Sequence, residues 1–181
     1  NSRQALRGQE MRKRWKRISS LISTRVAVWF FALMGYSMCS VTVAEASVCS
    51  ASTTSIESSA ELISFIASLD SCETLQGTLT ISGEEITDLD GLESIKELTG
   101  SLNLRAPNLA DIQGLRNLRA IGGALNVGAS GTGGTALPNL DDLASLVSVG
   151  SLSLFGNRQL IQIDALSRVT DLKGVWIYRN S

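Results

Sequence analysis

The feature that most constrains this chain is a 23-residue repeat in its second half. The segments 75–81, 98–104 and 121–127 align residue for residue, and each begins 23 residues after the previous one. Two further copies begin at Val149 and Leu172, again 23 residues apart, with one residue fewer before the strand. Periods of roughly 20–50 residues are typical of repeat architectures. The repeat therefore predicts a fold made of stacked copies of one unit.

The apolar residues between these segments follow the same period. They form three columns with 23-residue steps, broken once by a longer step: Leu89, Ile112, Leu140 and Ile163; Leu92, Leu115, Leu143 and Leu166; Ile95, Leu118, Leu146 and Val169. The longer step coincides with the Gly-rich stretch 128–135, which we interpret as a surface-loop insertion.

Each repeat also contains a short alternating stretch, in which apolar Leu79 and Ile81 are interleaved with Thr78, Thr80 and Ser82. Such alternation predicts a half-buried strand. One unit cannot bury its apolar side alone, whereas five stacked units align their strands into a parallel sheet around a continuous core. The predicted fold class is mainly β, a leucine-rich solenoid with parallel strands. Segments such as 89–95 fit either short helical turns or a second extended side.

A helix is predicted before the first repeat. Ser58 and Glu61 have the spacing of a capping box, and the apolar residues that follow have helical spacing: Leu62, Ile63, Phe65, Ile66 and Leu69. We expect a helix over 59–69 that covers the amino-terminal end of the solenoid. The fifth repeat breaks off at 178–181, so we expect further repeats or a capping element downstream.

Residues 11–46 have the pattern of a secretory signal peptide. Basic residues crowd 12–17, an apolar run covers 26–34, and small residues end at Ala46, after which we expect cleavage. An uncleaved signal anchor is the alternative, because 26–43 is about long enough to span a bilayer. Residues 1–10 precede the expected start Met11 and have no predicted structure, which leaves 47–181 as the solenoid domain.

Secretion would determine whether the cysteines form a disulfide. Cys39 would leave with the signal peptide, so the mature chain would keep Cys49 and Cys72 in a compartment where disulfides persist. We predict that these two residues pair; two free buried thiols are the alternative.

Composition excludes several function classes. Residues 47–181 carry eight basic and 15 acidic residues, a net charge of −7, which lacks the basic footprint of a nucleic-acid-binding domain. The chain has no His, which excludes Ser-His-Asp and Cys-His catalysis and imidazole metal sites. No cofactor is predicted. The adjacent acid pairs Glu84–Glu85 and Asp141–Asp142 lack a third ligand at metal-binding spacing, so we interpret them as a solvated rim.

The chain resembles the receptor L domain, the module of EGF- and insulin-receptor ectodomains with relatives among fungal cell-wall surface proteins. The resemblance covers about 48–181 and lies in Val48–Cys49, the helix, Cys72–Glu73 and units such as 92–104 and 115–127, whose apolar residues and Gly follow the spacing of the pattern L-x-x-L-x-x-I-x-G-x-L-x-I. It implies a right-handed solenoid, and it implies a disulfide across the cap helix between the first two cysteines, in agreement with the predicted pairing.

Strand positions that face away from the core indicate where a ligand would bind. In the early repeats these positions are small and polar, whereas the last two repeats present Phe155, Trp176 and Tyr178. Exposed aromatic residues on adjacent strands are typical of contact surfaces, and Arg105 is a further candidate on the same face. The alternative is that downstream coils or a flanking domain cover these aromatic residues. Asn157 and Asn180 are 23 residues apart, and we expect both to bind turn backbone inside the coils.

These features predict a secreted or cell-surface, non-catalytic recognition module that binds an extracellular protein or carbohydrate through the sheet face. A structural cell-wall or matrix protein is the alternative. An enzyme of the β-helix polysaccharide lyase or hydrolase type is not expected, because Arg105 is the one charged residue at these outward positions. Membrane contact is expected only through a signal anchor or a downstream anchor.

Overall fold

The computed structural model describes residues 47–129 and 134–180. The segment 1–10, the predicted signal peptide 11–46, residues 130–133 of the Gly-rich stretch and Ser181 lie outside the described residues. Within the described ranges, no helix has the length and apolar character needed to cross a membrane.

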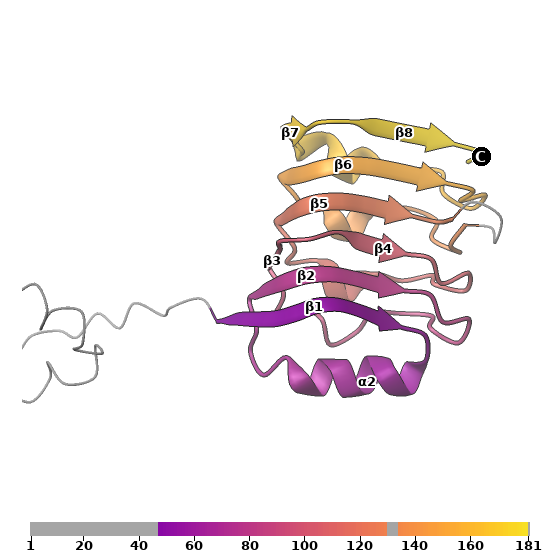
Figure 1. The fold of residues 1–181 in the computed structure, drawn as a ribbon. Coiled ribbons are helices and arrows are strands. Elements are labelled where there is room, and N and C mark those ends of the chain that lie inside the picture. The colour runs from indigo at the N-terminus through magenta and orange to yellow at the C-terminus, as the bar shows by residue number, and fades with distance from the viewer. Residues whose placement is uncertain (1–46, 130–133, 181) are drawn as a thin grey trace, which may run out of the picture. The chain divides into compact units, whose positions relative to one another are not determined.

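One parallel sheet contains the described strands and confirms the mainly β fold class. Its members are β1 (Val48–Ile56), β2 (Thr74–Ile81), β3 (Glu97–Leu98), β4 (Leu102–Leu104), β5 (Ala120–Val127), β6 (Ser148–Phe155), β7 (Asp171–Leu172) and β8 (Val175–Tyr178). The short strands β3 and β4 lie between β2 and β5, and β7 and β8 both pair with β6. Figure 1 shows the strands stacked from β1 at one end to β8 at the other.

The pairing register repeats from strand to strand. Leu79 of β2 pairs with Leu102 of β4, which in turn pairs with Leu125 of β5. Leu125 then pairs with Leu152 of β6, so the register continues across the longer step between the third and fourth repeats. The register shifts once within the β5–β6 pair, between Ile121 and Ala124, where the fourth repeat is one residue shorter. Equivalent residues therefore form rows that cross the sheet.

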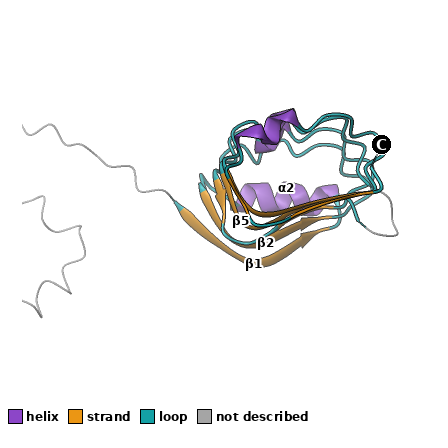
Figure 2. Cartoon of the chain, turned by 90° about the horizontal axis from the view of Figure 1, so that it is seen from above, coloured by secondary structure: helices purple, strands orange, loops and turns teal. Residues whose placement is uncertain are grey.

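The side opposite the sheet consists of turns and short 3₁₀ helices (Figure 2): η1 (Gln113–Leu115), η2 (Asp141–Leu143) and η3 (Asp164–Arg168). Of the two alternatives for these segments, the structure has short helical turns and not a second extended side. The three columns of Leu and Ile residues turn inward, and their members from 89 to 146 are all buried. Neighbouring units pack closely here. A Cβ atom added to Gly114 would lie only 1.8 Å from the carbonyl oxygen of Leu89, so no larger residue fits at this position.

The predicted helix is α2 (Ser59–Ser68), which lies beside β1 (Figure 1). The side chain of Ser58 accepts a hydrogen bond from the backbone N–H of Glu61 at 3.2 Å, as expected of a capping residue. The Glu61 carboxylate in turn accepts from the N–H of Glu57 at 2.7 Å. The helix ends one residue before the predicted limit, because Leu69 is its C-cap.

Strand β1 was not predicted from the sequence. Its residues are mostly Ser and Thr, and a register shift between Ser50 and Thr53 interrupts its pairing with β2. Its place in the sheet depends on its pairing with β2.

A disulfide links β1 to the residues that precede β2. Cys49 of β1 and Cys72, just before β2, form this bond with a Cα–Cα distance of 5.8 Å. The predicted Cys49–Cys72 pairing is confirmed.

Candidate ligand-binding face

The outward side chains toward the carboxyl ends of the strands form three rows, which together we call the polar face. The register of the sheet, extended by one residue beyond the paired positions where needed, assigns the rows as Thr78, Ser101, Ala124, Ser151 and Gly174; Thr80, Asn103, Asn126, Ser153 and Trp176; and Ser82, Arg105, Gly128, Phe155 and Tyr178. Most of these side chains are small, whereas the inward alternate positions carry the large apolar residues of the core.

Hydrogen bonds fix the polar side chains of the middle row. The Asn103 side-chain amide donates to Thr80 Oγ1 at 2.9 Å, and the Asn126 amide donates to Asn103 Oδ1 at 2.7 Å. In the part of the chain that the structure describes, Asn126 Oδ1 and the Ser153 hydroxyl have no hydrogen-bond partner. The row therefore presents one amide oxygen and one hydroxyl, side by side on adjacent strands, to a ligand.

Aromatic residues gather at the β8 end of the polar face. Trp176 and Tyr178 are 61% and 58% exposed, and the Tyr178 ring lies 5.5 Å from that of Phe155. The Arg179 guanidinium lies 5.4 Å from the centre of the Tyr178 ring, a cation–π contact. On the other side of β8, Val175 and Ile177 are also exposed, although their partners Leu152 and Leu154 are buried.

A hollow lies at the carboxyl ends of β4, β5 and β6. Its volume is about 390 Å³, and it is lined by Arg105, Asn126, Gly128, Ala129, Ser153 and Phe155. The structure thus brings together two of the predicted site residues, Arg105 and Phe155. Trp176 and Tyr178 lie beyond its lining, on the neighbouring strand. Sequence reasoning did not select Asn126 and Ser153, although the repeat places both between Arg105 and the aromatic residues.

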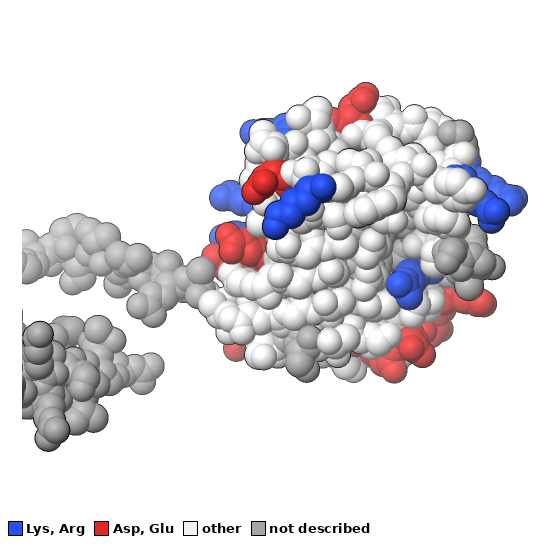
Figure 3. All heavy atoms as spheres, turned by 45° about the horizontal axis from the view of Figure 1, so that its top comes forward, with Lys and Arg blue, Asp and Glu red and all other residues white. Residues whose placement is uncertain are grey.

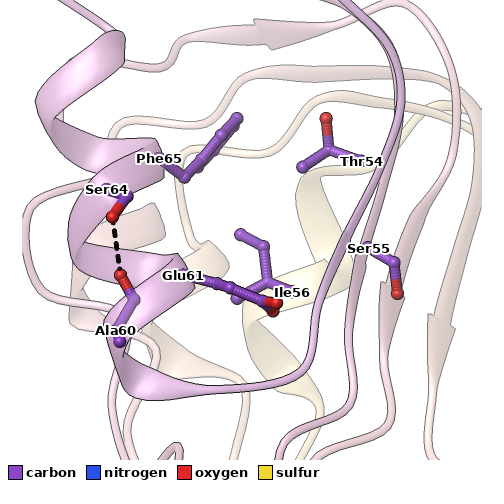
Figure 4. Close-up of a pocket in the computed structure, with 7 residues that line it drawn as sticks. All are labelled: Thr54, Ser55, Ile56, Ala60, Glu61, Ser64 and Phe65. Carbon is purple, nitrogen blue, oxygen red and sulfur yellow. Dashed lines mark hydrogen bonds between the residues drawn. The ribbon is translucent and has the colours of Figure 1, made fainter.

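A second hollow, of about 410 Å³, lies between β1 and α2 (Figure 4), where Glu61 and Phe65 extend from the helix toward the strand. Its polar groups on the helix already have partners: Glu61 binds the Glu57 N–H, and Ser64 Oγ donates to the Ala60 carbonyl at 2.9 Å. This hollow offers a ligand little unsatisfied polar chemistry.

Charged side chains lie at the margins of the polar face. Figure 3 shows a broad uncharged area with acidic and basic groups around its edges. Two acids on the strands, Glu97 and Asp171, lie in the row of Thr74, at the opposite ends of the strands from the hollow. The polar face is therefore suited to hydrogen bonding and stacking, with Arg105 as its one charged side chain.

Comparison with known protein families agrees with this architecture. The family model described as "Receptor L domain" matches residues 71–164, which is more than half of the chain. The chain belongs to the receptor L domain family. No curated protein and no solved structure shows significant similarity to it. Membership confirms the resemblance drawn from the sequence and indicates a ligand-binding extracellular module.

The acid pairs of this receptor L domain lie outside the three rows of the polar face. Glu84 and Glu85 are exposed, and Asp141 and Asp142 belong to η2 on the opposite side of the sheet. Burial, followed by the nearby carboxylates of Asp111 and Asp141, raises the pKa of Asp142, while Arg116 opposes the shift. Among the described residues, no three Cys, Asp or Glu side chains converge as a metal site would require.

Proposed function

We propose that this receptor L domain is a secreted or cell-surface recognition module, without catalytic activity, that binds an extracellular protein or carbohydrate through the polar face. The observation that carries the proposal is the composition of that face. It combines fixed amide and hydroxyl groups with exposed aromatic rings, and both are typical of recognition surfaces.

The proposal includes the architecture behind the face. Residues 47–181 would form a right-handed solenoid of 23-residue repeats, closed at its amino-terminal end by α2 and preceded by the signal peptide 11–46. Repeat architectures present extended binding surfaces because every unit contributes one strand to the same face. The parallel register of equivalent residues supports this arrangement.

The absence of catalysis is argued from the same residues. Glycoside cleavage commonly uses two carboxyl groups placed on either side of the scissile bond. The three described rows of the polar face contain no Asp or Glu. The face is therefore equipped to bind a ligand rather than to cleave it.

The test is binding by a Trp176→Ala/Tyr178→Ala variant in an array of extracellular proteins and glycans. Both side chains are exposed, so we expect the thermal midpoint to stay unchanged and binding to weaken by at least about tenfold. The matched control is Ile63→Ala, which removes an exposed apolar side chain from α2 and should bind as the parent does. Equal binding by the double variant and the parent would contradict the proposal.

A further inference from the structure

We propose that the hollow at the carboxyl ends of β4, β5 and β6 binds an acidic sugar of a glycan, with Arg105 holding the sugar's carboxylate. This inference rests on the proposed function, because it names the ligand class for part of the polar face. Four groups carry it: the Arg105 guanidinium, Asn126 Oδ1, the Ser153 hydroxyl and the Phe155 ring.

Arg105 is a cation without a counter-charge. Its backbone is held in the sheet by a 2.7 Å hydrogen bond from its N–H to the carbonyl of Ile81, while its side chain is exposed. Among the described residues, no carboxylate forms an ion pair with the Arg105 guanidinium. A planar guanidinium in this state is suited to bidentate binding of a carboxylate.

Glu57, which follows the end of β1 outside the polar face, is in line with the row of Arg105 but does not neutralise it. The register of β1, β2 and β4 places Glu57 two strands away, which corresponds to about 9–10 Å at the usual strand spacing. The carboxylate of Glu57 already accepts a hydrogen bond from Ser55 Oγ at 3.3 Å. Glu57 therefore leaves the Arg105 guanidinium available to an anionic ligand, although Glu57, Glu84 and Glu85 add negative charge at the same end of the strands.

The other groups of the hollow match the remainder of a sugar. Asn126 Oδ1 accepts hydrogen bonds and the Ser153 hydroxyl both donates and accepts, so together they suit the hydroxyl groups of a sugar ring. Phe155 supplies an apolar surface, and the contact with Tyr178 supports its ring. A volume of about 390 Å³ lies in the range of small-ligand sites.

An acidic peptide is the competing ligand. A Glu or Asp side chain would engage Arg105 but would bring no hydroxyl groups to Asn126 and Ser153, whose polar atoms would remain unpaired or hydrated. A sugar acid carries a chemical partner for each of the four groups. The chemistry of the hollow therefore favours the glycan over the peptide.

The experiment is calorimetric titration of the full chain with three probes: a tetramer of galacturonic acid, the neutral tetramer of galactose, and a tetramer of glutamate. We expect the galacturonate tetramer to bind at least about tenfold more tightly than the other two probes, with weaker binding at high salt. Arg105→Gln should remove the tenfold preference, and Arg105→Lys should keep part of it because the charge remains.

The matched control is Arg119→Gln, which removes the same charge from an exposed site at the opposite end of β5 from Gly128. We expect this variant to bind the galacturonate tetramer as the parent does. Equal loss in both variants would show a nonspecific charge effect and would overturn the inference. Galacturonate binding that survives Arg105→Gln, or an absence of galacturonate binding by the parent, would overturn it as well.

Failure of this inference is distinguishable from failure of the proposed function. Preference for the glutamate tetramer would overturn the acidic-sugar assignment but would leave recognition through the polar face intact. Loss of all ligands on the array in the Trp176→Ala/Tyr178→Ala variant would likewise support the proposed function whatever the galacturonate result.

Discussion

At the scale of single residues, Asn157 connects three parts of the chain. It is fully buried, its Oδ1 accepts from the N–H and hydroxyl of Thr135, and its amide donates to the carbonyl of Val127 at 2.9 Å. Asn180 makes the equivalent bond to the carbonyl of Leu154 at 2.9 Å and also accepts from the Asn157 N–H. The predicted structural role of both asparagines is confirmed.

Replacement of Asn157 by Ala should lower the free energy of unfolding by about 2–4 kcal/mol, because it leaves buried backbone groups of Thr135 and Val127 unsatisfied. Urea denaturation measures the change. Asn117→Ala is the control: Asn117 is exposed and donates to the carbonyl of Glu93, so about 1 kcal/mol or less should be lost. Equal losses in the two variants would contradict the role assigned to Asn157.

The site residues show what could be read from the sequence. Arg105 and Phe155 were predicted because their side chains stand out in otherwise small, polar rows. Asn126 and Ser153 were not, because their value depends on which of their polar atoms remain unpaired, and this depends on the direction of the Asn103–Asn126 hydrogen bond. Sequence spacing locates such residues but does not show which polar atoms are free.

At the scale of elements, the disulfide joins β1 to the start of β2. Cys72 is fully buried, while β1 lies at the edge of the sheet and is rich in Ser and Thr. A Cys49→Ser/Cys72→Ser variant should lose about 3 kcal/mol, the amount expected from closing a loop of this length. Thermal melting without reductant should show a lower midpoint for the variant.

Reductant provides the control for the disulfide prediction. Dithiothreitol should lower the midpoint of the parent toward that of the double variant and leave the variant itself unchanged. A parent and a variant that melt together under non-reducing conditions would show that the Cys49–Cys72 bond contributes nothing to stability.

The elements differ in how well the sequence predicts them. Helix α2 was predicted nearly to its last residue, since its capping residues and apolar spacing are local signals. The repeat strands were predicted because Leu and Thr alternate within them. Strand β1 was missed, because Ser- and Thr-rich sequence carries little periodicity and only pairing with β2 defines the strand.

At the scale of the whole molecule, the fold separates the apolar core from the face that we propose for recognition. Inward side chains of the strands and of the η segments form one apolar core, so the outward positions are free to vary. The same register that aligns the Leu columns also aligns the rows of the polar face. Under the proposed function, changes at a few outward positions would alter ligand specificity without disturbing the core.

The central claim is that the ligand occupies the polar face. The most direct measurement is backbone-amide NMR of the full chain during titration with a ligand identified on the array. The account predicts that amide signals in the carboxyl-terminal halves of β4, β5, β6 and β8 shift, while those of η1, η2 and α2 stay in place. Shifts confined to η1, η2 or α2 would contradict it.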